Sequence, residues 1–143
     1  MLDEPARGNT LRYIFADPRS RDFYTDWESA AIEAVHYLRA SRALYPKDTT
    51  VDDLIHELHD ASEDFRRMWH THEVGYHGAG KRGFRNRRLG DLELGFVNLE
   101  LPERPGVRVT VYTADPGSAS AAALSRALAD GDHARPLDAA VAG

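Results

Sequence analysis

Apolar residues in the first half of the chain recur at spacings of three and four, which is typical of amphipathic helices. The first such set, Leu11, Ile14 and Phe15, follows Asn9, whose side chain can cap a helix. Pro18 should end this helix, because a proline disfavours helical dihedral angles in the residue before it. The pattern therefore predicts a short first helix between Asn9 and Pro18.

Three further helices are predicted before residue 72. One should run from about Asp26 to Ala43, where apolar residues keep the helical spacing. Thr50 and Asp53 resemble a capping box that opens the next helix. Ser62 precedes two acidic residues and is expected to cap the fourth helix. The apolar face of this fourth helix carries Phe65, Met68, Trp69 and His72.

The apolar period changes to two in the second half of the chain, which is typical of strands. The even-numbered apolar residues from Leu92 to Phe96 are followed by odd-numbered ones from Val97 to Leu101. A shift of one residue moves the apolar set of a strand to the other face of the sheet. We therefore expect a β-bulge near Gly95 or Phe96 that keeps both sets on one face.

Turn and cap signals complete the expected order of elements. A hairpin turn is expected at 89–91, a third strand carries Val107, and Ser118 or Ser120 should cap a closing helix. This order predicts an α+β fold, with N-terminal helices packed on a three-stranded antiparallel sheet and a closing C-terminal helix. Residues 9–130 should form the domain, between a flexible segment at 1–8 and a disordered tail at 131–143.

The composition fits one globular domain and removes several kinds of chemistry. The chain has 143 residues, of which 42% are hydrophobic and 29% charged, enough for a single core. It contains no cysteine, which excludes disulfides, thiolate zinc sites and cysteine nucleophiles. Because no stretch resembles a signal peptide or a membrane span, we expect a cytoplasmic protein without membrane contact.

A basic run, KRGFRNRR from Lys81 to Arg88, stands in a chain whose formal net charge is −5. Arg82 and Phe84 share one face of the predicted strand, and charges fall on both faces, as on an edge strand protected against aggregation. Direct contact of this run with DNA is the alternative, although duplex-binding proteins are usually basic over their whole footprint.

Candidate catalytic and metal-binding residues have simpler explanations. His56 and His59 lack the i, i+4 spacing of zinc-protease ligands, and His70 and His72 point about 200° apart on a helix. Most serines stand at expected caps or in loops, and none lies in a G-x-S-x-G elbow. We therefore predict no enzymatic activity, no metal site and no cofactor.

Aromatic side chains gather on the predicted inward faces, and Arg12 lies one helical turn before one of them. A solid aromatic core with Arg12 at the surface is one interpretation. The other is an apolar cavity between helices and sheet with one cationic anchor, suited to an amphiphile with an acidic head group. The candidate ligand-binding residues are Arg12, Phe15, Tyr24, Trp27, Phe65, Trp69, Phe96 and Tyr112.

Five blocks of the sequence, in order, resemble one known family. They are NTLRYIFADP (9–18), FYTDWESAA (23–31), SEDFRRMWHTHEV (62–74), LGDLELGFVNLELPERPG (89–106) and VYTADPGSASAAAL (111–124). Together they resemble the ligand-binding domain of MmyB-like transcription regulators. In that family the domain follows an XRE-type helix-turn-helix in actinobacterial regulators.

The resemblance implies a PAS-like sensor fold, with a pocket between helices and sheet for a fatty acid or a similar lipophilic ligand. Pocket roles would fall on Arg12, Tyr24, Trp27, Phe65, Trp69 and Tyr112. The sequence departs from the family pattern at 84–87, where F-x-H-P is usual, and at Phe96, where a tyrosine is frequent.

The resemblance also implies a helix-turn-helix and two strands that should precede Asn9. We expect DNA contact only through such a helix-turn-helix, which this sequence lacks. A homodimer could cover the open edge of the sheet by strand addition. A dimerisation or protein-interaction module with a filled core and no ligand is the alternative function.

Overall fold

The computed structural model describes residues 9–71, 78–103 and 108–130, so the segments expected at 1–8 and 131–143, together with His72 and Val107, lie outside the described residues. The helices are α1 (Thr10–Ala16), α2 (Arg19–Phe23), α3 (Trp27–Leu44), α4 (Thr49–Ala61), α5 (Glu63–His70) and α6 (Ala119–Ala129). The strands are β1 (Ala79–Asn86), β2 (Gly90–Glu100) and β3 (Arg108–Thr113). The α+β prediction, with helices first and an antiparallel sheet after them, is confirmed.

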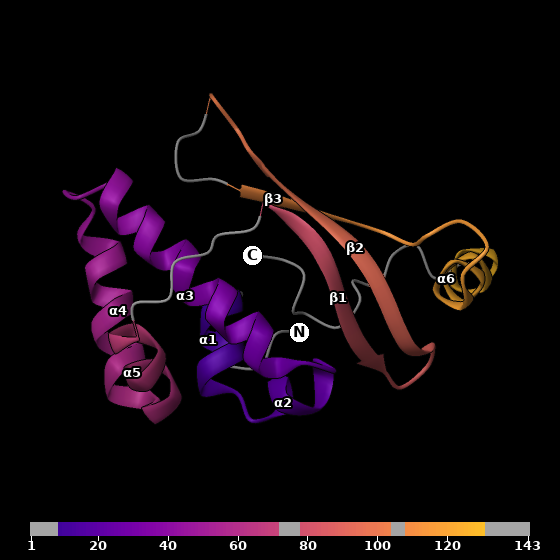
Figure 1. The fold of residues 1–143 in the computed structure, drawn as a ribbon, viewed down its shortest axis with the longest axis horizontal. Helices are drawn as coiled ribbons and strands as arrows, with labels where there is room; N and C mark the ends of the chain where they lie inside the picture. The colour runs from indigo at the N-terminus through magenta and orange to yellow at the C-terminus, as the bar shows by residue number, and fades with distance from the viewer. Residues whose placement is uncertain (1–8, 72–77, 104–107, 131–143) are drawn as a thin grey trace.

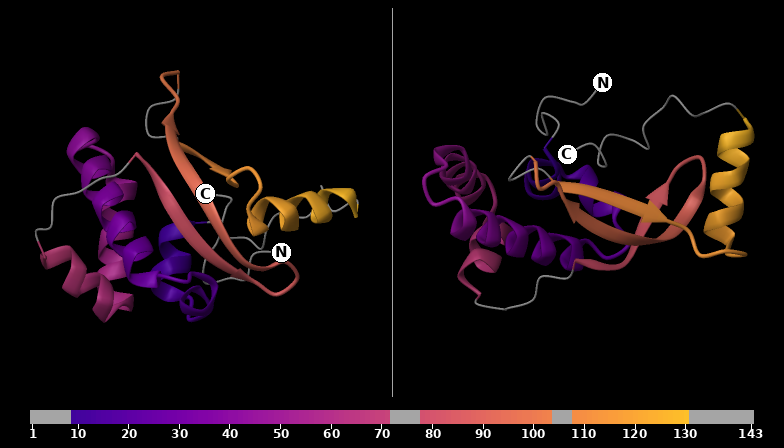
Figure 2. Two further views of the ribbon diagram at one scale, coloured as in Figure 1. Left: turned by 45° about the vertical axis from the view of Figure 1, so that its right-hand side comes forward. Right: turned by 90° about the horizontal axis from the view of Figure 1, so that it is seen from above.

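The sheet separates α6 from the other helices. Its strand order is β1–β2–β3, and α1 to α5 gather on one side of it while α6 lies beside β2 (Figure 1). Two further views show the same separation (Figure 2). β3 pairs only with the second half of β2, from Gly95 to Glu100. In the first half, the Glu93 N–H donates to Ser120 Oγ at 2.9 Å, so the start of α6 covers this edge.

Side-chain caps define where most helices begin. Predicted caps that the structure confirms are Asn9, Ser62 and Ser118. The predicted capping box of Thr50 and Asp53 is wrong, because Asp48 caps α4 instead. The Asp48 carboxylate accepts the backbone N–H of Thr50 at 2.9 Å and also its hydroxyl, so the helix begins at Thr49. An aspartate at this position satisfies an N–H that the first turn leaves unpaired.

The short helix α2 was not predicted, and one of its residues ties three helices together. Ser20 is buried, and its Oγ donates to the carbonyl of Ile14 at 2.9 Å. The same Oγ accepts the indole N–H of Trp27 at 3.0 Å. Ser20 therefore joins the end of α1 to the start of α3 through α2.

The predicted bulge is wrong, because the described register of β2 is continuous. Its residues from Gly90 to Val97 each face one residue of β1, and those from Gly95 to Glu100 each face one of β3. The side chains of β2 therefore alternate between the two faces of the sheet without interruption. The buried residues Leu92, Leu94 and Phe96 face the helices, and the following odd-numbered residues face away from them.

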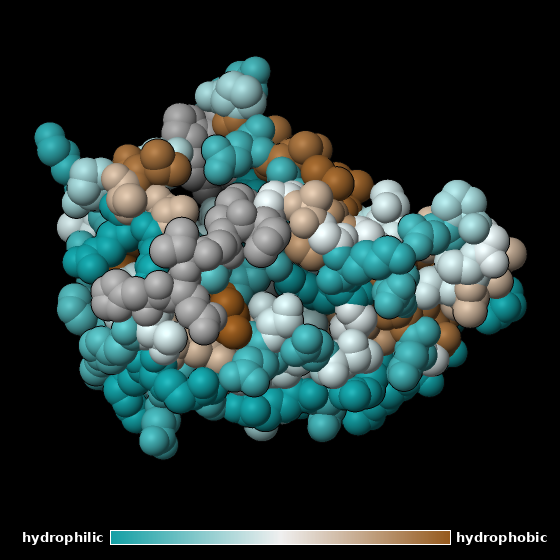
Figure 3. All heavy atoms as spheres, in the orientation of Figure 1, coloured by the Kyte–Doolittle hydropathy of each residue, from teal (hydrophilic) through white to brown (hydrophobic). Residues whose placement is uncertain are grey.

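The consequence is an outer aliphatic face on the sheet, formed by Val97, Leu99, Val109 and Val111. Val97 faces Val111 and Leu99 faces Val109 across the two strands. These side chains are 41 to 48% exposed. Figure 3 shows apolar surface over this end of β2 and β3. An antiparallel sheet commonly presents a polar face to water, so exposed aliphatic pairs are a notable departure.

The hairpin turn between β1 and β2 lies two residues before its predicted place. Residues 87–89 form it, and the Asn86 carboxamide oxygen accepts the N–H groups of Arg88 at 2.9 Å and Leu89 at 3.0 Å. Gly90 then begins β2 with a φ of 79°, a conformation that glycine adopts without steric cost.

Helix α3 is the centre of the helical layer. Its buried residues are Ala30, Ala31, Val35 and Leu38. The backbone of α3 comes close to α1, α2, α4 and α5, and less close to the strands. Glu33 and Tyr37 lie one turn apart on α3 and interact with residues of the sheet.

Replacing Phe65 by alanine should strongly destabilise the domain. Phe65 of α5 is fully buried and packs against Phe15 of α1. Its replacement by alanine is expected to lower the free energy of unfolding by about 3–5 kcal/mol. Leu44 is 63% exposed, and Leu44→Ala should change it by less than about 0.5 kcal/mol. Urea unfolding followed by circular dichroism measures both. A small effect of Phe65→Ala would contradict this core.

Candidate functional site

Half of the candidate ligand-binding residues form a ring group inside the helical layer. Phe15 lies edge-on to Phe65, with ring centres 5.1 Å apart, and edge-on to Trp27 at 6.0 Å. Phe65 stacks on Trp69 at 5.5 Å. These four rings, from α1, α3 and α5, contact one another directly.

A second ring group lies on the side of the sheet that faces the helices. Phe84, which was not a candidate, lies at its centre, 5.7 Å from Tyr24 and 5.3 Å from Tyr112 between ring centres. Phe96 lies 6.4 Å from Tyr112. The structure therefore distributes the aromatic candidates over two groups, one within the helices and one on the sheet.

Arg12 lies outside both ring groups. Its Nε and Nη2 each donate to a carboxylate oxygen of Glu57 at 2.8 Å, which joins α1 to α4. This hydrogen-bonded pair raises the pKa of Arg12 above its ordinary value. The forked geometry of the guanidinium is thus already matched by a carboxylate of the same chain.

An ion pair that sequence reasoning missed connects α3 to the sheet. Arg82 on β1 donates through Nη2 to Glu33 on α3, and their side chains are only 14% and 17% exposed. The guanidinium of Arg82 also lies over the ring of Phe96, 4.8 Å from its centre. The sequence did contain a signal for this position. Arg82 lies two residues from the buried Phe84 on the same strand, so both side chains lie on the face of the sheet that is toward the helices.

Polar contacts extend this pair across the sheet. Asn98 on β2 donates to Glu33 through its amide nitrogen at 3.5 Å, and its amide oxygen accepts the hydroxyl of Thr110 on β3 at 2.8 Å. Arg108 on β3 lies over the ring of Tyr37 on α3, 3.6 Å from its centre. Each strand therefore sends a polar side chain toward α3.

We call the region between these groups the α3–sheet seam. Its residues are Glu33, Tyr37, Arg82, Phe96, Asn98, Arg108, Thr110 and Tyr112. Most of them are partly exposed, so water reaches the seam. Long side chains span the wider distance that separates α3 from the strands.

Two phenols of the second ring group have raised pKa values. Burial raises the pKa of Tyr24 far above the ordinary value for a phenol, and burial also raises that of Tyr112. The positive charge of Arg82 acts in the opposite direction on both groups. Both phenols therefore remain protonated, and able to donate hydrogen bonds, well beyond neutral pH.

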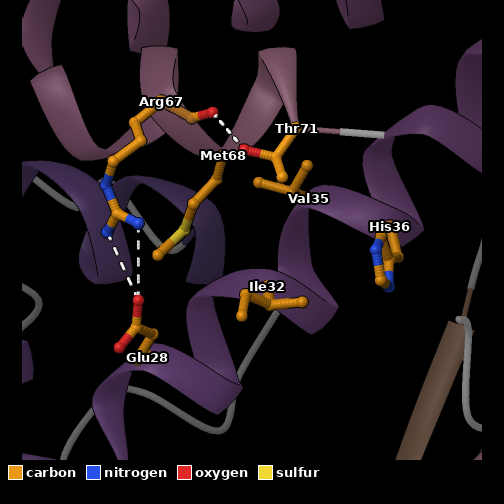
Figure 4. A pocket seen from close by; sticks show the side chains of 7 residues that line it. All are labelled: Glu28, Ile32, Val35, His36, Arg67, Met68 and Thr71. Carbon is orange, nitrogen blue, oxygen red and sulfur yellow. Dashed lines mark hydrogen bonds and ion pairs between the residues drawn. The ribbon is translucent and has the colours of Figure 1, made fainter. Parts of the chain in front are cut away.

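A small cavity lies on another side of α3, between this helix and α5. Its volume is about 90 Å³. Ile32, Val35 and Met68 converge on it, while the ion pair of Arg67 with Glu28 lies at its rim (Figure 4). A pocket for a drug-sized ligand usually has about 300–1,000 Å³, so this cavity alone holds only a few heavy atoms.

Other residues of the basic run serve contacts within the domain. Lys81 donates to Glu93 at 3.3 Å and to Asp115 at 2.7 Å on the outer side of the sheet. Arg85 donates to the carbonyl of Tyr24 at 3.3 Å. Together with Arg82, three of the basic side chains thus bind groups of the same domain.

The structure brings two of the considered histidines together. The rings of His59 on α4 and His70 on α5 lie edge-on, with centres 6.2 Å apart. Within residues 9–71, 78–103 and 108–130, no group of three or more histidine or carboxylate side chains is placed to hold a metal ion. In the same ranges, no helix is long and apolar enough to cross a membrane.

Alkaline titration should show that Tyr24 and Tyr112 ionise at a higher pH than an ordinary phenol, because burial raises the pKa of both. Unfolded chains ionise their phenols near pH 10, so the folded state should lose stability as the pH rises above that value. Absorbance at 295 nm measures phenolate formation, and Tyr24→Phe should remove the latest step. If all six tyrosines ionised together below the unfolding pH, the burial of these phenols would be contradicted.

Comparison with known proteins identifies the family. The family model described as the MmyB-like transcription regulator ligand binding domain matches residues 2–128, in agreement with the resemblance seen in the sequence. Searches among curated proteins and among solved structures found no match to this chain. The match covers most of the sequence, and the chain therefore belongs to the MmyB-like transcription regulator ligand binding domain family.

Proposed function

We propose that this domain senses a small amphiphile with an acidic head group, such as a fatty acid, for a cytoplasmic transcription regulator. The family supports a ligand-sensing role. The observation that carries the proposal is the α3–sheet seam, where aromatic and cationic side chains lie together between a helix and the strands. The aromatic side chains can contact an apolar tail, and the cationic side chains can bind an acidic head group.

The seam is also a place where the domain could open, because the backbone of α3 lies closer to the neighbouring helices than to the strands. The aliphatic residues of α3 are buried in a layer formed with α1, α4 and α5. Moving the strands away from α3 would expose long side chains such as Arg82 and Tyr37, which already reach water. A ligand tail would then replace ring contacts such as that of Phe96 with Tyr112.

The expected affinity depends on tail length. Burial of twelve methylene groups contributes on the order of 10 kcal/mol, at about 0.8 kcal/mol for each group. Association costs about 4–15 kcal/mol before any binding is observed. Short acids should therefore bind weakly, and detectable binding should begin at medium chain lengths.

In this proposal the candidate residues have two roles. The tail contacts the sheet group, which contains Tyr24, Phe96 and Tyr112. The helical wall behind it is formed by Phe15, Trp27, Phe65 and Trp69, with Arg12 at its outer side. In this proposal the domain acts as a PAS-like sensor, and DNA contact is left to a helix-turn-helix domain of the regulator.

The outer aliphatic face favours a second candidate function, that of a homodimerisation module. The outer edge of β3 pairs with no strand among the described residues, and this edge borders the exposed Val109 and Val111. A second copy could add its own β3 in antiparallel orientation about a two-fold axis. Such pairing would satisfy the backbone groups of both edges and place the two aliphatic faces side by side.

Filling the seam should abolish fatty-acid binding, whereas filling the small cavity should not. Thr110→Trp places a ring in the seam, and Ile32→Trp places one in the cavity between α3 and α5. We expect dodecanoate to raise the melting temperature of the wild type and of Ile32→Trp, but not of Thr110→Trp. Native mass spectrometry of the three freshly purified proteins gives a second measurement. No dodecanoate adduct and no thermal shift for the wild type would contradict sensing.

Placing a charge on the outer aliphatic face should prevent self-association. Val111→Lys should convert a dimer into a monomer with little effect on the melting temperature, because Val111 is exposed and a charged edge strand resists pairing. Leu44→Lys, at an exposed site of α3, is the matched control. Light scattering after size-exclusion chromatography measures the mass. A monomeric wild type at high protein concentration would rule out the homodimer.

A further inference from the structure

We propose that Arg82 is the anchor for the acidic head group, and that Glu33 occupies the place of this head group in the ligand-free domain. This inference rests on the proposed function and deepens it. It assigns the head group to a side chain of β1, in the seam, rather than to Arg12 on α1. The ligand class is a monocarboxylate with an apolar tail.

Arg82 is selected by its burial and by its unused donors. Its side chain is 14% exposed, whereas that of Arg12 is 26% exposed. Among the described residues, its single hydrogen bond runs from Nη2 to Glu33. No buried side-chain nitrogen or oxygen of the described part is without a partner, so Nε and Nη1 of Arg82 reach solvent. An arginine has five N–H donors, so Arg82 can bind a second carboxylate.

Arg12 and Arg19 differ from Arg82, because each already binds a carboxylate through two of its nitrogens. Arg12 already directs Nε and Nη2 to the two oxygens of Glu57. Arg19 is held in the same forked way by the carboxylate of Asp17, with Nε 2.9 Å from one oxygen. A ligand would have to displace a bidentate partner from either of them.

The surroundings of Arg82 orient its guanidinium toward the seam. The ring of Phe96 supports one face of the group. That ring lies so close to Gly80 that a Cβ there would be 3.0 Å from it, so the glycine allows the ring to lie against β1. Low exposure strengthens a charge-assisted hydrogen bond relative to one at the surface.

The two phenols add neutral donors to the same region. The charges of Arg82 and Glu33 both act on the pKa of Tyr24 and on that of Tyr112, which places the four groups within electrostatic range. Because burial keeps both phenols protonated, either can donate to a carboxylate without carrying a negative charge. One cation and two neutral donors suit a single carboxylate.

Glu33 makes the site responsive to the charge of the head group. A second carboxylate at Arg82 lies close to Glu33 and repels it, because like charges at short range are unfavourable. Glu33 can turn away while Asn98, now 3.5 Å from it, offers a neutral donor. Any such movement acts on α3, so head-group binding changes the contact between α3 and the sheet.

The test compares dodecanoate with dodecan-1-ol, which has the same tail and no charge. Isothermal titration calorimetry is done on the wild type, on Glu33→Gln and on the double variant Arg82→Gln with Glu33→Gln. The double variant replaces an ion pair by two amides and so leaves no unpaired charge in the seam. Arg87→Gln, at an exposed position of the turn, is the control.

The double variant should bind dodecanoate about 10- to 100-fold more weakly, as expected for the loss of hydrogen bonds to a charged group, and bind the alcohol as the wild type does. Glu33→Gln should bind dodecanoate about 3- to 10-fold more tightly, because the competing carboxylate is gone. A purely structural role of Glu33 would instead weaken the binding of both compounds.

The remaining outcomes separate this inference from the proposed function. If the double variant kept the preference of the wild type for the acid, Arg82 would not be the anchor, while lipid sensing would stand. Weaker dodecanoate binding by Glu33→Gln would overturn the exchange of carboxylates. If the wild type bound neither compound, the proposed function would fail, and the anchor with it.

Discussion

The buried stripe of α3 is the constraint on which the rest of the structure depends. Packing with α1, α4 and α5 uses this stripe, and the helical layer is stabilised by apolar burial. Glu33 and Tyr37 then face the sheet, where Arg82 and Arg108 meet them. A nearly buried ion pair adds little net stability, because desolvation offsets the attraction between the charges. The ion pair between Arg82 and Glu33 therefore contributes more to the orientation of α3 on the sheet than to the stability of their contact.

The local part of the fold could be predicted from the sequence, because its determinants are close along the chain. A cap such as Asn9 or Ser62 acts on backbone groups two or three residues away, and the helical spacing marks the buried face. Asp48 was missed because Thr50 and Asp53 matched the spacing of a capping box two residues later. The bulge was wrong for a different reason. Sequence alone does not reveal that aliphatic residues such as Val97 lie on an open face, so burial was assumed for all of them.

The candidate site was predictable in residue type but not in arrangement. Aromatic periodicity found the rings that line the interior, but it could not divide them between helices and sheet, since that division depends on the tertiary packing of α3. Arg82 was treated as part of a surface run, although it shares strand parity with the buried Phe84. Its partner Glu33 lies 49 residues earlier, and no local pattern links two such positions. Arg12 was favoured because it lies close in sequence to Phe15.

If the proposed ligand binds in the seam, the seam offers a physical route from that ligand to the surface of the domain. A ligand can shift an equilibrium only if it binds two conformations with different affinity. Here the two conformations would differ in the contact between α3 and the strands, because that contact contains the charged groups that an acidic ligand can engage. Helices α1, α4 and α5 pack on α3 and would move with it as one layer. The opposite face of the same strands carries the outer aliphatic residues, so a change in the twist or position of β2 and β3 would reach the proposed dimer contact directly.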